Sequence, residues 1–264
     1  MNLLGDIVSR KREEVANARK LRSLNDLEGA IPSAPPVRPL RGGRDLSGRP
    51  GVIAEMKRRS PSRGLIRDPY DPVALADGYH RAGARALSIL TDGPFFGGDL
   101  SDLARVRRTP PGEALPLLRK DFVVDPYQVV ESRVAGADIL LLIVRILPGT
   151  LLADLLKLGM ALGLTVLVEA HTEEEVERAL SAGAQVVGVN SRDLDTLAID
   201  WDRGGRLLSS LPRGILRVAE SGLKTRADYL RMGELGADFV LVGESFLVSP
   251  DPGRALEDFC GLVD

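Results

Sequence analysis

Residues 135–144 read AGADILLLIV: a glycine between two alanines, one acidic residue, and then six apolar side chains. A glycine just past the end of a helix supplies a left-handed cap at little steric cost. An unbroken apolar run of this length is typical of a strand that is buried on both faces. The decapeptide therefore predicts a joint at which a helix ends and a buried parallel strand begins.

The same joint recurs three times, at residues 82–85, 182–185 and 235–238, so that the glycines lie 53, 47 and 53 residues apart. Further short apolar runs lie about midway between the joints. These runs are residues 52–54, 115–118, 165–168 and 215–219. The repeating unit is therefore half of the spacing between joints, one strand followed by one helix.

The segments between these runs read as helices, and several of them begin with Pro, Asp or Thr in the first turn. We expect the helices at residues 72–82, 100–108, 126–135, 151–162, 173–182, 202–210, 225–235 and 252–262. Eight strand–helix units within residues 51–264 have the size of a closed (β/α)8 TIM barrel. An open doubly wound sheet is the alternative, but the regular spacing and the count of eight favour closure.

The segment before the barrel has a different character. Apolar residues recur at helical spacing over residues 2–20, which predicts an amphipathic helix that needs a partner surface. Residues 30–51 are rich in Pro and Gly and read as a connector. We therefore divide the chain into an N-terminal helix and connector, residues 1–50, and a barrel catalytic domain, residues 51–264.

Composition narrows the function classes. The 264 residues carry 35 basic and 37 acidic side chains, a net charge of −2, which argues against a nucleic-acid-binding surface. The longest apolar run, residues 139–144, is too short to cross a membrane. Residues 1–6 lack the basic residues with which a secretory signal peptide begins. A single cysteine, Cys260, fits a cytoplasmic protein, and only two histidines argue against a histidine-built metal site.

Polar residues follow six of the eight apolar runs, where the chemistry of such barrels lies. They include two lysines, three carboxylates and an amide: Glu55, Lys57, Lys120, Glu169, Asn190 and Glu220. A single charged residue at a strand end is also what a strand reaching solvent shows, so each alone says little. Because polar residues follow six of the predicted strands, we expect these side chains to converge at one end of the barrel, where the strands have their carboxyl ends.

Only six of the 35 basic residues are lysines, yet two of them, Lys57 and Lys120, lie at predicted strand ends. An ammonium releases a proton when burial or a neighbouring cation lowers its pKa, whereas a guanidinium effectively does not. We predict that Lys120, preceded by Arg119, is a general acid and that Lys57 is a second acid or holds an anion. A surface role for either lysine is the alternative.

Two glycine-containing turns follow the last two strands, at Ser221-Gly222 and Gly243-Glu244-Ser245. Loops in these two positions commonly bind phosphate in a (β/α)8 barrel, although either glycine could be an ordinary turn residue. The backbone amide of Glu244 would matter more than its carboxylate, which would repel the anion. We therefore expect a small phosphorylated substrate.

The loop at residues 57–69 is long enough to act as a lid. Phe95, Phe96 and Phe122 follow the second and third strands and would suit an apolar part of the substrate, or simply belong to the core.

At these residues the sequence resembles the indole-3-glycerol-phosphate synthase family. The matching blocks are residues 53–62 (IAEMKRRSPS), 118–122 (LRKDF), 125–128, 168–169, 188–194, 219–222 and 242–245. The N-terminal helix is similar to that family's extra helix. The resemblance implies a (β/α)8 barrel that closes an indole ring on 1-(2-carboxyphenylamino)-1-deoxyribulose 5-phosphate, releasing carbon dioxide and water, with no organic cofactor and no metal.

The resemblance also implies roles in proton transfer. Lys120 would protonate the substrate ketone as the ring carbon attacks, and Glu169 would accept a proton. Lys57, held by Glu55, would grip the substrate carboxylate and act as a second acid in the dehydration. Whether Glu169 or Glu220 finally accepts the proton is left open.

The remaining implied roles are in binding. Asn190 and Glu220 would position the sugar hydroxyl and the intermediate, Arg192 the carboxylate side, and Ser221 the sugar. The residues implied at the phosphate are Ser60, Gly222, Gly243 and Glu244, and those implied at the anthranilate ring are Pro61, Phe96 and Phe122. We expect a monomer, or a weak homo-oligomer, with no nucleic-acid or membrane partner.

Two rival functions remain. Phosphoribosylanthranilate isomerase resembles this chain in fold, but it uses a cysteine early in the barrel and an aspartate, whereas the only cysteine here is Cys260 in the last predicted helix. A barrel that only binds phosphorylated metabolites is the other rival. The intact set of Lys57, Lys120 and Glu169 argues against it, because a pure binder has no evident use for acids and bases.

Overall fold

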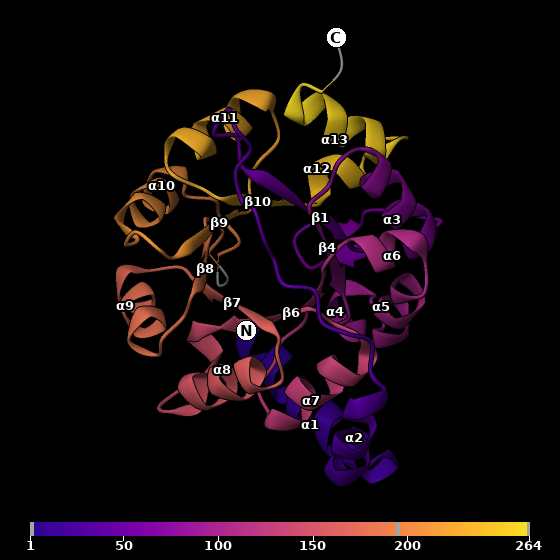
Figure 1. Cartoon of the computed structure of the whole chain (residues 1–264). Coiled ribbons are helices and arrows are strands. Elements are labelled where there is room, and N and C mark those ends of the chain that lie inside the picture. The colour runs from indigo at the N-terminus through magenta and orange to yellow at the C-terminus, as the bar shows by residue number, and fades with distance from the viewer. Residues whose placement is uncertain (1–2, 194–195, 263–264) are drawn as a thin grey trace.

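Eight parallel strands close into a barrel in the computed structural model, which describes residues 3–193 and 196–262. The strands are β1 (Gly51–Met56), β4 (Ala86–Leu90), β5 (Leu117–Lys120), β6 (Ile139–Ile143), β7 (Thr165–Ala170), β8 (Val186–Asn190), β9 (Leu216–Glu220) and β10 (Phe239–Val242). Each strand pairs with the next, and β10 pairs with β1 to complete the ring (Figure 1). The predicted (β/α)8 barrel is confirmed.

Helices surround the barrel on its outside, as the sequence predicted (Figure 1). They are α3 (Pro72–Arg81), α5 (Leu100–Arg107), α7 (Pro126–Ala135), α8 (Leu151–Ala161), α9 (Glu173–Ser181), α10 (Trp201–Ser210), α11 (Arg226–Glu234) and α13 (Pro252–Cys260). Gly136, in the decapeptide quoted first, caps α7 with φ +94°, as predicted. Leu194, which ends one of the blocks quoted above, and residues 1–2 and 263–264 lie outside the described residues.

Several short elements were not predicted. They are α2 (Leu24–Ala30), α4 (Gly93–Phe96), α6 (Pro110–Ala114), α12 (Glu244–Leu247), the 3-10 turns η1 (Ile31–Ser33) and η2 (Val144–Ile146), and a small hairpin of β2 (Arg59–Ser60) and β3 (Gly64–Leu65). Such short pieces carry too few residues to show a period.

The Pro- and Gly-rich connector crosses the end of the barrel at which the strands begin (Figure 1). The backbone N–H of Arg38 donates to Asp138 (2.7 Å), which directly precedes β6, and the N–H of Leu40 donates to Thr165, the first residue of β7. Leu40 itself is buried in the core. The connector therefore covers the N-terminal end of the barrel. Its separation from the barrel as a domain stays a prediction.

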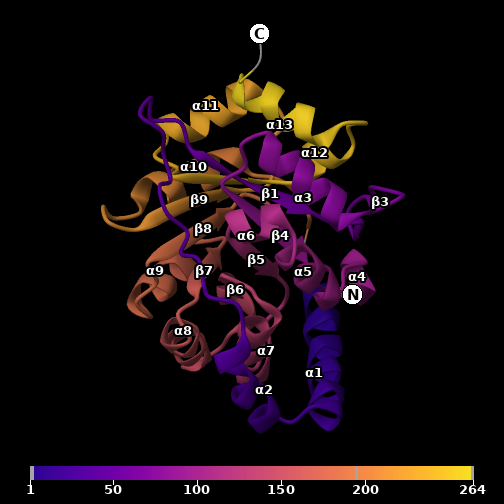
Figure 2. The same cartoon turned by 45° about the vertical axis from the view of Figure 1, so that its right-hand side comes forward.

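The N-terminal helix α1 (Leu3–Leu21) lies on the other side of the barrel from the connector (Figure 2). Leu4 and Ile7 belong to the core. The buried ammonium of Lys11 lies 3.0 Å from a carboxylate oxygen of Asp92 and 2.9 Å from one of Asp121, which follow β4 and β5. The partner surface that the sequence required of this helix is thus the rim at the carboxyl ends of the strands.

Replacing Lys11 with methionine is expected to lower the free energy of unfolding by about 3 kcal/mol or more, because it leaves the buried carboxylate of Asp92 without its cation and that of Asp121 with Arg119 alone. Urea unfolding followed by circular dichroism measures the change. Lys20→Met, at an exposed position of the same helix, is the matched control and should leave stability nearly unchanged. Equal stabilities of the two variants would show that the buried ion pairs do not hold α1 in place.

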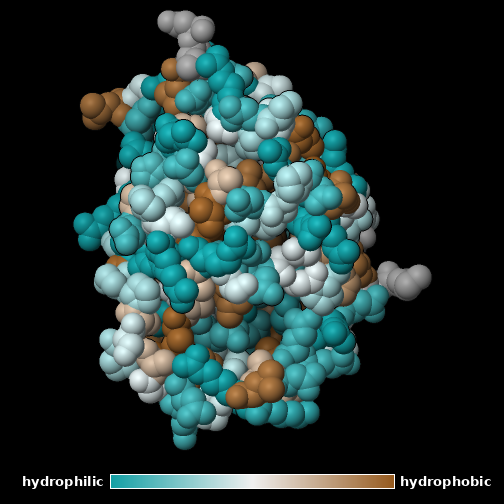
Figure 3. All heavy atoms as spheres, turned by 90° about the vertical axis from the view of Figure 1, so that its right-hand side faces the viewer, coloured by the Kyte–Doolittle hydropathy of each residue, from teal (hydrophilic) through white to brown (hydrophobic). Residues whose placement is uncertain are grey.

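On the surface in Figure 3, hydrophilic side chains predominate and apolar ones are scattered. No helix within residues 3–193 and 196–262 combines the length and the apolar content that a bilayer crossing requires.

Candidate active site

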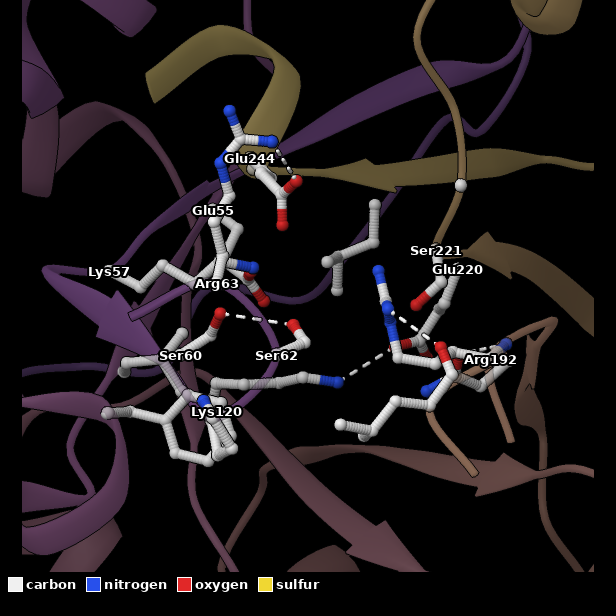
Figure 4. A pocket seen from close by; sticks show the side chains of 18 of the residues that line it. Glu55, Lys57, Ser60, Ser62, Arg63, Lys120, Arg192, Glu220, Ser221 and Glu244 are labelled. Carbon is white, nitrogen blue, oxygen red and sulfur yellow. Dashed lines mark hydrogen bonds and ion pairs between the residues drawn. The ribbon is translucent and has the colours of Figure 1, made fainter. Parts of the chain in front are cut away.

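A cavity of about 600 Å³ opens at the carboxyl ends of the barrel strands. All fifteen residues that were assigned a catalytic or binding role line it: Glu55, Lys57, Ser60, Pro61, Phe96, Lys120, Phe122, Glu169, Asn190, Arg192, Glu220, Ser221, Gly222, Gly243 and Glu244. They come from all parts of the barrel, and the closed sheet brings them together. Figure 4 shows several of them pointing into the same space.

Lys120 lies at the centre of the site. It is the last residue of β5, and its Nζ lies 2.7 Å from Glu169 Oε2 and 2.8 Å from Glu220 Oε2, on β7 and β9 (Figure 4). Burial by itself would lower the pKa of Lys120, but the charges of Glu169, Glu220 and Glu55 outweigh it and raise that pKa. The lysine is therefore a stable ammonium that presents its protons to the cavity.

The neighbouring cation that was expected to lower the pKa of Lys120 does not face it, and the expectation of a lowered pKa is wrong. Successive residues of a strand face opposite sides of the sheet, so Arg119 points away from the cavity. Its guanidinium bonds to Glu131 on α7 (2.8 Å) and to Asp121 (3.1 Å). Lys120 meets carboxylates on its own side instead of a cation.

The two carboxylates that share Lys120 differ in their surroundings. The amide of Asn190 donates to Glu169 Oε1 (3.0 Å). Although burial opposes ionisation of Glu169, Lys120 and His171 hold its pKa well below the ordinary value. Burial and the negative charge of Glu169 instead raise the pKa of Glu220. The site thus contains one carboxylate that stays ionised, Glu169, and one whose ionised form is disfavoured before the substrate binds, Glu220.

Gly188 on β8 makes room for Glu220, because a Cβ there would lie 2.2 Å from Glu220 Oε1. Gly243 does the same for Glu55, since its Cβ would lie 2.7 Å from Glu55 Oε1. The sequence explained Gly243 only by the approach of a ligand. The structure adds a second reason, the space that a neighbouring catalytic candidate needs.

Lys57 and Glu55 form an ion pair at the rim, with Nζ 2.5 Å from Glu55 Oε1. Beside them Ser60 Oγ and Ser62 Oγ lie 3.2 Å apart (Figure 4). This group comes from β1 and the loop that follows it, so a movement of the predicted lid would move part of the site.

Glu244 begins the short helix α12, and its carboxylate faces Arg63 of the lid loop at 3.0 Å (Figure 4). This contact turns the acid towards a cation. The backbone N–H groups of Phe246 and Leu247 donate to the carbonyl of Gly243, so the N–H groups of Glu244 and Ser245 are the ones that the helix does not use for its own bonds. In the turn after the neighbouring strand β9, Ser221 and Gly222 have φ of +69° and +84°.

One wall of the cavity is apolar. The ring centroids of Phe96 and Phe122 lie 5.9 Å apart, and Pro61 also lines the cavity. Phe95, the third phenylalanine considered in the sequence, packs against the core and is not among the described residues that line the cavity.

Sequence reasoning missed part of this wall. Leu3, Leu4 and Ile7 of α1 also line the cavity. Their helical spacing was visible in the sequence, but not the surface that they would meet. His171 was considered only as a metal ligand, yet it lies fully buried beside Glu169.

Arg192, which follows β8, is held in place by two hydrogen bonds. Its backbone N–H donates to Asn190 Oδ1 (3.0 Å) and its guanidinium donates to the carbonyl of Leu197 (3.0 Å). Within residues 3–193 and 196–262, no cluster of His, Cys, Asp and Glu has the arrangement of a metal site. The expectation that the protein needs neither metal nor cofactor stays a prediction.

Comparisons with known proteins extend over nearly the whole chain. A family model described as indole-3-glycerol phosphate synthase matches residues 4–259. A protein of that name from Mycobacteroides abscessus is 47% identical over 259 residues, 97% of this chain and 93% of that protein. One from Mycobacterium ulcerans is 46% identical over 256 residues, with the same two shares covered.

Solved structures share the fold at low identity. A 3-hexulose-6-phosphate synthase superposes with a TM-score of 0.64 at 14% identity, over 81% of this chain and 100% of that one. A thiamine phosphate pyrophosphorylase from Pyrococcus furiosus gives 0.60 at 16% identity, over 83% and 97%. These two likenesses support the barrel alone.

Proposed function

The chain belongs to the indole-3-glycerol phosphate synthase family, and on that premise we propose that Lys120, Glu169 and Lys57 carry the proton transfers of its reaction. The enzyme is a carboxy-lyase of tryptophan biosynthesis. It converts 1-(2-carboxyphenylamino)-1-deoxyribulose 5-phosphate into indole-3-glycerol phosphate and releases carbon dioxide and water. The observation that carries the proposal is the buried ammonium of Lys120 between two carboxylates in the cavity.

In the first step a ring carbon of the substrate attacks the ketone carbon, and negative charge develops on the ketone oxygen. Lys120 has three N–H donors, of which two point to Glu169 and Glu220, leaving one for the substrate. A proton delivered there stabilises the transition state more than the ground state. The high pKa of Lys120 keeps this donor charged before the substrate binds.

The next steps restore the aromatic ring. The carboxylate leaves the ring as carbon dioxide, and its bonding electrons return to the ring system. Hydroxide then departs with a proton from an acid, and a base removes the proton that remains on the five-membered ring. We assign the acid of this dehydration to Lys57 and the base to Glu169, whose low pKa keeps it ionised.

The remaining residues would bind the substrate. The phosphate fits the space bordered by Ser60, Gly222 and the first turn of α12, where unused backbone N–H groups favour an anion. The anthranilate ring fits the apolar wall of Phe96, Phe122 and Pro61. The remaining binding assignments are Ser221 to the sugar, Asn190 and Glu220 to the sugar hydroxyl and the intermediate, and Arg192 to the carboxylate side. Glu244 contributes its amide, because its carboxylate faces Arg63.

Replacing Lys57 with glutamine is expected to raise the KM about tenfold and to lower kcat about a hundredfold, because both the carboxylate grip and the second acid are lost. Steady-state kinetics, followed by the fluorescence of the indole product, measure both constants. Arg58→Gln is the matched control, since Arg58 is exposed and pairs with Asp68 on the surface. Unchanged constants in Lys57→Gln would remove Lys57 from the reaction.

Every residue of the proposed site comes from one chain, so we propose that a monomer is sufficient for activity. Sedimentation at working concentration, with activity independent of dilution, tests this. The buried free thiol of Cys260 fits a reducing compartment, and we propose that the enzyme works in the cytoplasm. Cys260 lies in α13 and is not among the described residues that line the cavity. The rival isomerase reaction needs a cysteine in the active site, so the position of Cys260 argues against it.

A further inference from the structure

His171 is a buried titratable residue that none of the steps above uses. It directly follows Ala170, the last residue of β7, and none of its surface is exposed. It lies two residues beyond Glu169. Because side chains alternate along a strand, the chain arrives at His171 on the same side of the sheet as Glu169.

One ring nitrogen of His171, Nδ1, is held by a glutamate of α9. His171 Nδ1 lies 3.1 Å from Glu175 Oε2, and the backbone N–H of His171 donates to the same oxygen (2.7 Å). The other oxygen of Glu175 accepts from Arg145 Nε of η2 (2.8 Å). The ring orientation is thus fixed by two contacts to one carboxylate, which is itself fixed by an arginine.

The other ring nitrogen faces the active site. His171 Nε2 lies 3.3 Å from Glu169 Oε1, an ion-pair distance, although the two atoms are not aligned as a hydrogen bond. The oxygen that it meets is the one to which Asn190 donates, while Lys120 contacts the other oxygen. A continuous series of contacts therefore runs from Arg145 through Glu175 and His171 to Glu169.

The charged groups around His171 favour its cationic form. Glu169 faces it from β7 and Glu175 from α9, while Arg145 and Lys120 lie one contact further away, on the far sides of these carboxylates. Burial alone would lower the pKa of His171, but its contacts with the two glutamates raise it to about 9. Glu169 thus has two cationic neighbours, Lys120 and His171, whereas among the described residues Glu220 is in contact with Lys120.

We propose that His171, held by Glu175, is a positioning residue that keeps Glu169 ionised and aimed at the reacting centre, so that Glu169 rather than Glu220 accepts the proton. The inference rests on the role of Glu169 proposed above. It adds that His171, which does not touch the substrate, determines which of the two carboxylates in contact with Lys120 accepts the proton.

The pH dependence of kcat tests the proposal. In His171→Asn the cation is lost while an amide can still meet Glu175, so the pKa of Glu169 rises and Glu169 is protonated at a higher pH. The acidic limb of the profile is then expected to move up by about one pH unit or more, so that kcat at a fixed pH on that limb is about tenfold lower or more, while the KM stays within about threefold of the wild-type value. A folded variant with the wild-type profile would overturn the proposal.

Glu175→Gln gives a second, independent variant. It leaves the imidazole in place but removes the charge that fixes it, so the acidic limb should move in the same direction by a smaller amount. Glu174→Gln is the matched control, because Glu174 is exposed on the same helix and should leave the profile unchanged. An unchanged profile in both Glu175→Gln and His171→Asn would contradict the positioning role.

The charge of His171 is measurable without turnover. The chain has two histidines, so side-chain ¹H–¹⁵N spectra contain two imidazole systems, and His80→Asn identifies the signals of His171. We expect His171 to stay doubly protonated through pH 8 in the wild-type enzyme; a neutral ring at pH 7 would overturn the proposal. If Glu169→Gln were fully active, the role of Glu169 itself would fail, a result distinct from either outcome of this titration.

Discussion

Replacing Lys120 with methionine is expected to lower kcat by about three orders of magnitude or more. Methionine keeps much of the apolar stem, but it has no proton to place on the ketone oxygen while the ring closes. It also leaves Glu169 and Glu220 side by side without the cation between them. The phosphate contacts and the apolar wall remain, so substrate binding should weaken far less than turnover.

Steady-state formation of the indole product measures kcat, and calorimetric titration under single-turnover conditions measures the dissociation constant. Lys157→Met, an exposed lysine on α8, is the control and should keep wild-type kinetics. If Lys120→Met turned over near the wild-type rate while folded, Lys120 would not be the general acid. A loss of binding equal to the loss of turnover would make it a binding residue instead.

Replacing Glu169 with glutamine is expected to lower kcat by about two to four orders of magnitude, the range that removal of a positioned base covers. The amide is nearly the same size, but its single oxygen can accept from only one of Lys120 and Asn190, and the negative charge is lost. Circular dichroism should show the native fold. Rates at saturating substrate across pH 5–9 measure the loss.

Two comparisons sharpen this result. Glu177→Gln, exposed on α9, should behave as the wild type. Glu220→Gln should lose less activity than Glu169→Gln. The raised pKa of Glu220 means that a smaller fraction of this carboxyl is ionised and able to accept a proton. The opposite order would transfer the acceptor role to Glu220, and a near-normal rate of Glu169→Gln would remove Glu169 from the proton chemistry.

The barrel was predictable because one local signal repeats. Each Gly-Ala joint marks the same physical event, a capped helix followed by a doubly buried strand, and each of the four apolar runs at these joints is a strand. The strand expected at residues 115–118 is shifted to Leu117–Lys120, because Leu115 caps the short helix α6 and Pro116 has no N–H group to donate to a neighbouring strand. The connector could not be placed from sequence, since its contacts to Asp138 and Thr165 lie 100 and 125 residues away.

The site shows the same division between local and distant information. Strand ends place the lysines and carboxylates, and the resemblance adds residues such as Ser60, Pro61 and Arg192, so fifteen of the residues that line the cavity could be named in advance. The error over Arg119 arose from adjacency in sequence, whereas the alternation of a strand sends Arg119 outward and His171 to the side of Glu169. The apolar face of α1 at the cavity depends on docking through Lys11, for which the sequence offers no local sign.

The most direct test of the account is incubation of the purified enzyme with 1-(2-carboxyphenylamino)-1-deoxyribulose 5-phosphate, with indole fluorescence and carbon dioxide release recorded together. We predict that both signals appear in equal amounts and that neither appears with the Lys120→Met enzyme. An absence of product with the folded wild-type protein, or equal product with the variant, would contradict the assignment of ring closure to this site.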